Sequence, residues 1–228
     1  MQNDKLGIFD LLTFIVPGGT LLYFLAYAIH PFFRLESFIV MGDSNYLLVP
    51  FFFLSYYVGH MVSFVARKWE YKGMGEKQVW LIYLNQNIER AKRLDALCVN
   101  KFGYAFMESE TVSAQKSENF FDQSYVLLET KQKSDKIALL MAQFGFFRSA
   151  VVVFIMATFF LLISAIVAKT YIVNLSLPFY FIAAFCFCSI FACVRLMRER
   201  KRWMMTAVYQ NFETYCTTSK ETDTNGKN

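Results

Sequence analysis

Histidine offers the most versatile chemistry in this sequence, because an imidazole titrates near neutral pH and also binds metal ions. The chain contains two, His30 and His60. His60 lies in the apolar stretch YYVGHMVSF, and a titratable side chain in such a membrane-spanning segment usually faces a bundle interior or water. Its functional roles would be proton sensing or a polar lining. The simpler interpretation, which we favour, is a structural imidazole near the inner membrane interface, bonded to a backbone group or a Tyr hydroxyl.

Three more polar side chains are candidates for the same intramembrane region. Ser63 and Glu70 follow His60 at helical spacings, so the three share a stripe if the helix persists. Arg148 lies just before the apolar run VVVFIMATFF. It could extend to the membrane surface or pair with Glu70 across the bundle, and we expect the first.

No catalytic, nucleotide-binding or metal-binding motif stands out. With two histidines there is no HExxH pattern, and the spacing of Cys186, Cys188 and Cys193 has no second pair to complete a metal site. A Walker loop, a GxGxxG turn and a GxSxG elbow are also missing from the sequence. We therefore expect no metal, no cofactor and no enzymatic activity.

Four apolar blocks must position these residues. Hydrophobic residues make up 56% of the 228 residues, which is too apolar for an ordinary soluble domain. The net charge of +5 is too small for a nucleic-acid-binding domain, so we expect no direct contact with nucleic acid. The blocks are long enough to cross a bilayer as helices: Leu11–Ile29, Tyr46–Ala66, Ser149–Ala168 and Leu177–Val194. The predicted fold is all-α, a polytopic membrane protein with four transmembrane helices and a helical cytoplasmic bundle.

The distribution of Lys and Arg predicts the orientation of these spans. The loop after the first span contains only Arg34 and the loop after the third only Lys169, which leaves 21 of the 23 basic residues on the other side. By the positive-inside rule, both termini and the long middle segment are cytoplasmic. A basic cluster that would bind anionic lipid follows the fourth span: Arg195, Arg198, Arg200, Lys201 and Arg202.

Pro17, Gly18 and Gly19 interrupt the first span near its middle. Proline removes an intrahelical hydrogen bond, and glycine lets another backbone approach closely. The triplet is therefore a candidate hinge for a gate. The alternative, which we favour, is a kinked site where helices pack.

The segment between the second and third spans is long enough to form a small domain. The predicted boundaries are residues 1–66 for the first two spans, 67–146 for a cytoplasmic helical insertion, 147–194 for the last two spans, and 195–228 for a helical extension and tail. Residues 77–100 show the period of an amphipathic helix. Its charged side chains Glu89, Arg90 and Lys92 are candidates for binding a partner.

Three predictions concern the flanks of that helix. Residues 108–119 lack an apolar period and predict a turn or mobile segment. Residues 120–147 regain a helical pattern that includes Val126, and no proline separates them from the third span, so one helix could run into the bilayer. Residues 195–216 continue the fourth span without a breaker, with several residues expected to pack inward: Leu196, Trp203, Ala207, Tyr209 and Phe212.

Three classes of function are compatible with this organisation. One is a homo-oligomeric sensor or scaffold whose cytoplasmic bundle docks a soluble protein, and a tetramer is the favoured assembly. The second is an oligomeric pore or membrane-depolarising effector, which the sparse polar content of the spans would restrict to a narrow or hydrophobically gated path. The third is a lipid-processing membrane enzyme, which would need clustered polar groups that this sequence lacks.

The layout resembles small four-span bacterial inner-membrane proteins encoded in phage-defence loci, including Kiwa-type membrane subunits. Four stretches carry the resemblance: FDLLTFIVPGG, YYVGHMVSFVARKWE, FGFFRSA and RERKRW. The resemblance implies a multi-pass oligomer of the bacterial inner membrane that senses disturbance of the envelope and works with a soluble cytoplasmic partner.

Overall fold

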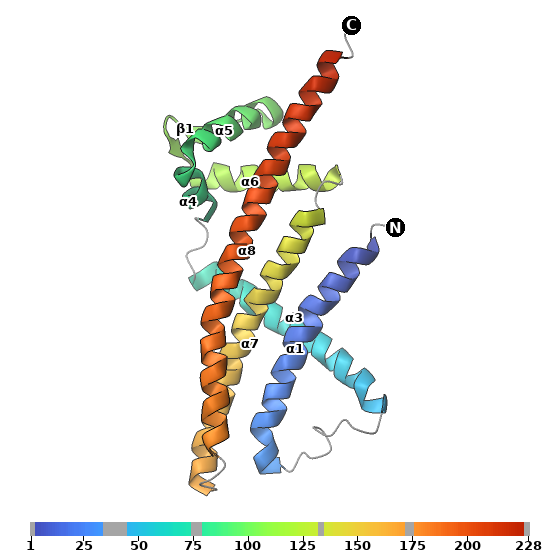
Figure 1. Cartoon of the computed structure of the whole chain (residues 1–228), viewed down its shortest axis with the longest axis vertical. Coiled ribbons are helices and arrows are strands. Elements are labelled where there is room, and N and C mark those ends of the chain that lie inside the picture. Colours follow the sequence, from blue (N-terminus) through green and yellow to red (C-terminus); the bar gives the residue numbers. More distant parts are fainter. Residues whose placement is uncertain (1–2, 34–44, 74–78, 132–134, 172–175, 226–228) are drawn as a thin grey trace. The chain divides into compact units, whose positions relative to one another are not determined.

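The protein is all-α apart from one short β-hairpin. The computed structural model describes residues 3–33, 45–73, 79–131, 135–171 and 176–225, with side chains placed in 13–29, 49–69, 81–131, 136–167 and 177–218. In chain order the elements are α1 (Asn3–Phe33), α3 (Asn45–Gly73), α4 (Val79–Gln86), α5 (Ile88–Phe102), β1 (Met107–Glu108), β2 (Thr111–Val112), α6 (Ala114–Thr130), α7 (Asp135–Tyr171) and α8 (Ser176–Asn225) (Figure 1). The predicted helical class is confirmed.

The chain divides into two compact units. The apolar unit comprises Met1–Lys72 and Ala142–Arg198, and the insertion unit comprises Gly73–Met141 and Glu199–Asn228. The two chain segments predicted as an insertion and an extension thus belong to one unit. Both α7 and α8 contribute residues to each unit.

Among the residues that the structure describes, three helices are long and apolar enough to cross a membrane. They are Val49–Trp69 in α3, Lys136–Val167 in α7 and Leu177–Thr218 in α8. The apolar part of α1 that the structure describes, Thr13–Ile29, is shorter. This composition and these lengths suggest a membrane protein, whereas the first of the four predicted spans stays a prediction.

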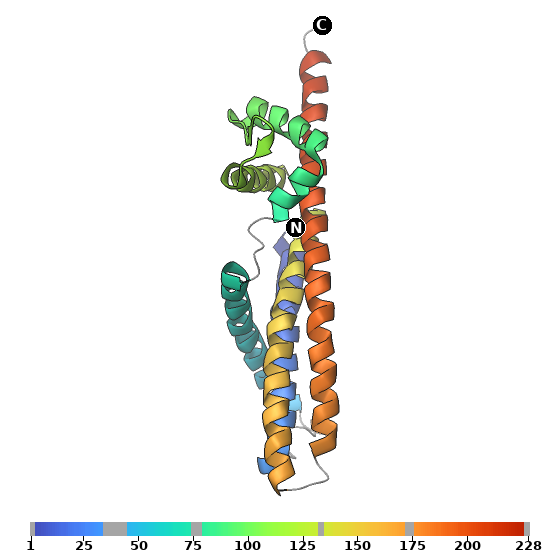
Figure 2. The ribbon, with the colours of Figure 1, turned by 90° about the vertical axis from the view of Figure 1, so that its left-hand side faces the viewer.

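Small residues allow close packing inside the apolar unit, as is common between membrane helices. Within this unit α7 and α8 run side by side (Figure 2), and Ser164 of α7 donates a hydrogen bond to the Ala28 carbonyl of α1 over 3.0 Å. One buried cluster joins α1, α7 and α8: Ala28, Ala157, Leu161, Ala165, Phe179, Ala183 and Cys186. A second joins α1, α3 and α7: Leu21, Val62, Ala66, Val152 and Val153.

An aromatic cluster forms the centre of the insertion unit. Phe120 of α6 is fully buried, and its ring contacts rings from three other parts of the unit. The centroid distances are 4.8 Å to Phe106, 6.3 Å to Phe102, 5.8 Å to Tyr209 and 5.3 Å to Phe212. Because Tyr209 and Phe212 belong to α8, the C-terminal helix is part of this core.

The predicted helix over residues 77–100 is broken at Asn87. There the backbone leaves the helical region, with φ −127° and ψ 56°, so α4 ends at Gln86 and α5 begins at Ile88. The Asn87 side chain donates to the Tyr83 carbonyl over 2.9 Å. Asparagine favours such local bonds over a continuing helix. The apolar face is otherwise as predicted, with Leu84 and Ala91 fully buried.

The prediction of a turn or mobile segment over residues 108–119 is confirmed at the hairpin turn, residues 109–110, and is wrong from Ala114 onward, where the chain is helical. Met107 pairs with Val112 and Glu108 with Thr111 in a hairpin, and α6 begins at Ala114. The Asp95 carboxylate of α5 accepts two backbone N–H bonds from the start of the hairpin, at 2.7 Å from Phe106 and 2.9 Å from Met107. Backbone and carboxylate bonds therefore order a stretch that lacks an apolar period.

The prediction of one helix from residue 120 into the third span is also wrong. Helix α6 ends at Thr130, and Lys131 caps it with φ −93° and ψ 10°. The last buried side chain of α6 is Leu128, and the next along the chain is Ile137 of α7. Between them the polar sequence offers no apolar group to bury, so nothing favours continuation of the helix.

The prediction that the fourth span continues as one helix is confirmed by α8. Ala207, Tyr209 and Phe212 are buried as expected. Trp203 is instead 49% exposed, and its ring lies 4.6 Å from the Arg200 guanidinium carbon. Its predicted inward packing is wrong because it stands on the helix face opposite the buried one.

Candidate functional site

Gly18 and Gly59 bring the backbones of α1 and α3 into direct contact where the helices cross (Figure 1). A Cβ atom at Gly18 would overlap the Ser55 carbonyl oxygen and lie 2.6 Å from the Gly59 nitrogen. A Cβ atom at Gly59 would overlap the Phe14 carbonyl oxygen. Because only glycine leaves room for this approach, the crossing depends on both residues.

The predicted hinge residues therefore lie at a packing contact. Pro17 is buried beside Gly18, and a Cβ at Gly19 would lie 3.3 Å from the Ser55 hydroxyl oxygen. Helix α1 is continuous from Asn3 to Phe33. A hinge motion at this triplet stays a prediction.

His60 lies beside the crossing. Its imidazole stacks on the Phe14 ring with centroids 3.8 Å apart, and it lies nearly perpendicular to the Tyr56 ring with centroids 4.5 Å apart. The side chain is nevertheless exposed at the surface of the apolar unit. It stands nine residues from the nearer end of the candidate span Val49–Trp69, about 14 Å along a helix.

Ser63 and Arg148, two of the other candidate polar residues, have surroundings different from those of His60. Ser63 is buried, one of the small residues on the face of α3 that packs inside the unit. Arg148 of α7 is half-buried, and its guanidinium carbon lies 5.5 Å from the Phe144 ring centroid. The side chain of Glu70 lies outside the described residues, so its pairing with Arg148 stays a prediction.

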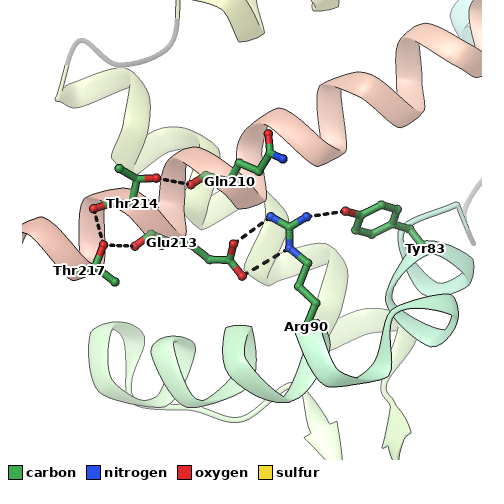
Figure 3. Close-up of polar contacts among 6 residues, drawn as sticks. All are labelled: Tyr83, Arg90, Gln210, Glu213, Thr214 and Thr217. Atoms are coloured by element: carbon green, nitrogen blue, oxygen red, sulfur yellow. Dashed lines mark hydrogen bonds and ion pairs between the residues drawn. The ribbon is translucent and has the colours of Figure 1, made fainter.

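Arg90 is a structural link within the insertion unit. It donates to the Glu213 carboxylate of α8 at 2.9 Å and 3.4 Å, and to the Tyr83 hydroxyl at 2.8 Å (Figure 3). The ion pair is mostly buried, with exposed side-chain fractions of 17% and 27%. Glu89 and Lys92, the other two candidates for partner binding, are exposed and pair with each other at 3.5 Å. Charge reversal at Arg90 would therefore disturb the fold as well as any docking surface.

Arg90→Ala is expected to loosen α4 and α5. Hydrogen bonds to charged groups contribute about 1.5–3 kcal/mol when partly buried, so amide exchange in residues 81–98 should accelerate by roughly 30-fold. Hydrogen exchange of the full chain in detergent measures this change. The matched control is Lys92→Ala, which removes an exposed pair worth less than about 1 kcal/mol. Equal exchange rates in the two variants would show that the network contributes nothing.

The basic cluster of α8 is not uniform. Arg195, Arg198 and Arg202 are exposed, whereas Lys201 is only 4% exposed and belongs to the buried face. Arg200 stacks on Trp203 as described above. Three of the five predicted lipid-binding residues thus present their side chains to the surroundings.

An open apolar groove lies between the end of α5 and α6. Its volume is about 410 Å³, and it is lined by Phe102, Asp122, Gln123, Val126, Leu127 and Thr130. Val126 is 54% exposed, although the sequence pattern places it among the inward-facing apolar residues. The reason is that Phe120, Ser124 and Leu128 form the buried face of α6, and Val126 stands across the helix from them.

One carboxylate, that of Asp122, lines this groove. Partial burial and the nearby Glu118 carboxylate raise the pKa of Asp122. The same combination, with Glu129 as the neighbour, raises the pKa of Tyr125. An uncompensated carboxylate beside an apolar surface favours a cationic partner, because a positive charge would offset its desolvation.

Sequence reasoning missed this groove. Val126 was the residue that could have revealed it, because it is apolar but does not lie on the buried face of its own helix. Recognising the phase requires the helix to begin at Ala114, and residues 108–119 show no helical period. The described residues hold no cluster of three or more His, Cys, Asp or Glu side chains arranged to bind a metal.

Comparison of the chain with models of protein families, with curated proteins and with solved structures finds no match.

Proposed function

We propose that this protein is an oligomeric sensor or scaffold of the bacterial inner membrane that docks a soluble cytoplasmic partner through its insertion unit. The observation that carries the proposal is the open groove over Phe102, Val126 and Leu127, an exposed apolar surface beside the Asp122 carboxylate. Exposed apolar patches with a polar rim mark sites of protein interaction. No enzymatic activity is part of the proposal.

The partner that fits this groove is a soluble protein presenting an amphipathic helix with Lys or Arg beside its apolar face. Apolar anchors at helical spacing would fill the groove. A basic side chain near Asp122 and Glu118 would compensate the carboxylate whose pKa is raised.

The apolar helices and the exposed basic residues of α8 support the membrane setting. Three apolar helices can span a bilayer, and we propose the apolar part of α1 as the fourth span. The basic residues exposed on α8 agree with cytoplasmic termini. Helix α8 contributes to both units as one continuous helix, so a change in its apolar half can reach the insertion unit through the backbone. The role in antiphage defence follows from the resemblance to Kiwa-type membrane subunits.

Val126→Asp is expected to weaken partner binding at least tenfold. Substitution of an interface residue that dominates binding commonly lowers the binding free energy by more than about 1.4 kcal/mol, which corresponds to that factor. The measurement is native mass spectrometry of the full chain extracted in mild detergent together with the soluble proteins encoded by its neighbouring genes. The wild type should carry a stoichiometric soluble protein.

Val99→Asp is the matched control, because Val99 is 46% exposed on α5 and does not line the groove. It should retain the partner. Equal retention by both variants would contradict the groove as the docking site. A bare wild-type oligomer that depolarises vesicles by itself would replace the proposal with the pore.

A further inference from the structure

We propose that the outward face of α3 around His60 is the surface on which a second copy of this chain packs. The inference rests on the proposed membrane location and oligomeric state, and is independent of any soluble partner. The opposite face of α3 is already occupied within the chain, since Ser55, Gly59 and Ala66 pack toward α1 and α7.

The outward face has the spacing of a helix–helix contact. Phe53, Tyr57, His60 and Phe64 recur at alternating intervals of four and three residues, which aligns them along one seam of a left-handed helix pair. The aromatic members are strongly exposed, at 72% for Phe53, 61% for Tyr57 and 66% for Phe64. We name this set the α3 seam.

His60 indicates what covers the α3 seam. A neutral imidazole has one N–H donor and one nitrogen acceptor, and its contacts among the described residues are the rings of Phe14 and Tyr56. Acyl chains offer no hydrogen bond at this depth, so a histidine here is expected to bond across to another helix. A second α3 running parallel brings its own His60 and Tyr57 hydroxyl to the same level, and these supply both a donor and an acceptor.

The exposed aromatic side chains could supply most of the area of such a contact. At about 200 Å² for each aromatic side chain, the three aromatic residues of the α3 seam expose roughly 400 Å² in each chain. Two chains would then bury about 800 Å², close to the ~1,000 Å² of a specific interface, before other residues contribute.

Disulfide crosslinking in native membranes tests the geometry. Single cysteines at Phe53, Tyr57 and Phe64 are introduced into a Cys188→Ala background, because Cys188 is the exposed native cysteine among the five described. Oxidation should produce covalent dimers at these three positions. Controls are Leu54→Cys and Val65→Cys on a flank of α3, roughly 100° around the helix from the α3 seam, and Phe181→Cys on α8, which are 48%, 37% and 70% exposed. Dimers at all positions, or at none, would overturn the proposal.

Substitution of His60 tests the polar contact. His60→Leu should weaken self-association by roughly three- to twenty-fold, the range measured for hydrogen bonds between membrane helices, whereas His60→Gln retains a donor and an acceptor and should associate almost as the wild type does. The measurement is fluorescence energy transfer between labelled chains diluted in vesicles. Wild-type association of His60→Leu would overturn the role of His60. Neither experiment contains a soluble partner, so failure of the docking proposal leaves both results unchanged.

Discussion

Phe120→Ala is expected to lower the free energy of unfolding of the insertion unit by about 4 kcal/mol, because truncation of a buried phenylalanine removes its packing and leaves a cavity. Phe120 is fully buried and contacts rings from α5, the start of the hairpin and α8. These contacts close the unit across segments far apart in the sequence. For a unit of this size, the unfolding midpoint should fall by roughly 15–30 °C.

Thermal unfolding of the full chain in detergent, followed by hydrogen exchange, measures this effect. Backbone amides in α5, α6 and the end of α8 should lose their protection from hydrogen exchange, while amides in the apolar unit should stay protected. Val99→Ala is the control, since it shortens an exposed side chain of α5 and should change the midpoint by only a few degrees. A shift for Phe120→Ala as small as that of the control would refute the assignment of Phe120 as the centre of the core.

Gly59→Ala is expected to destabilise the apolar unit by about 3 kcal/mol, at the upper end of the cost of overpacking. The added methyl group would overlap the Phe14 carbonyl oxygen and lie 2.9 Å from the Phe14 Cα atom. Because these are backbone atoms, no side chain can rotate away, and α1 and α3 must separate. Separation would also remove the stacking of His60 on Phe14.

The thermal midpoint of the detergent-extracted protein measures the loss. Gly145→Ala is a matched control in α7, because its new Cβ would lie 3.7 Å from the Thr13 side chain, an ordinary contact. Alanine has the higher helix propensity, so this control should be neutral or slightly stabilising. Similar midpoints for the two variants would show that the helix crossing is looser than described.

Composition and periodicity were sufficient for the helical class, the apolar segments and the continuity of α8. These features are local, since a run of apolar residues without a breaker favours a helix whatever it packs against. The same reasoning failed at Asn87, at the hairpin and at Lys131, where individual hydrogen bonds or the lack of a group to bury end an element. The pattern of apolar residues therefore does not predict where these elements end.

Tertiary structure decided which candidate residues can act. Arg90 carries the same charge as Lys92 and lies two positions from it, yet it binds Glu213 while Lys92 remains exposed. Gly18, a predicted hinge residue, contacts the backbone at Gly59. Val126, which the sequence pattern places in the core, lines a groove. The sequence by itself determined where apolar helices form, because that depends on neighbouring residues along the chain. Which face of each helix is covered depends on partners distant in the sequence, so only the folded chain could show it.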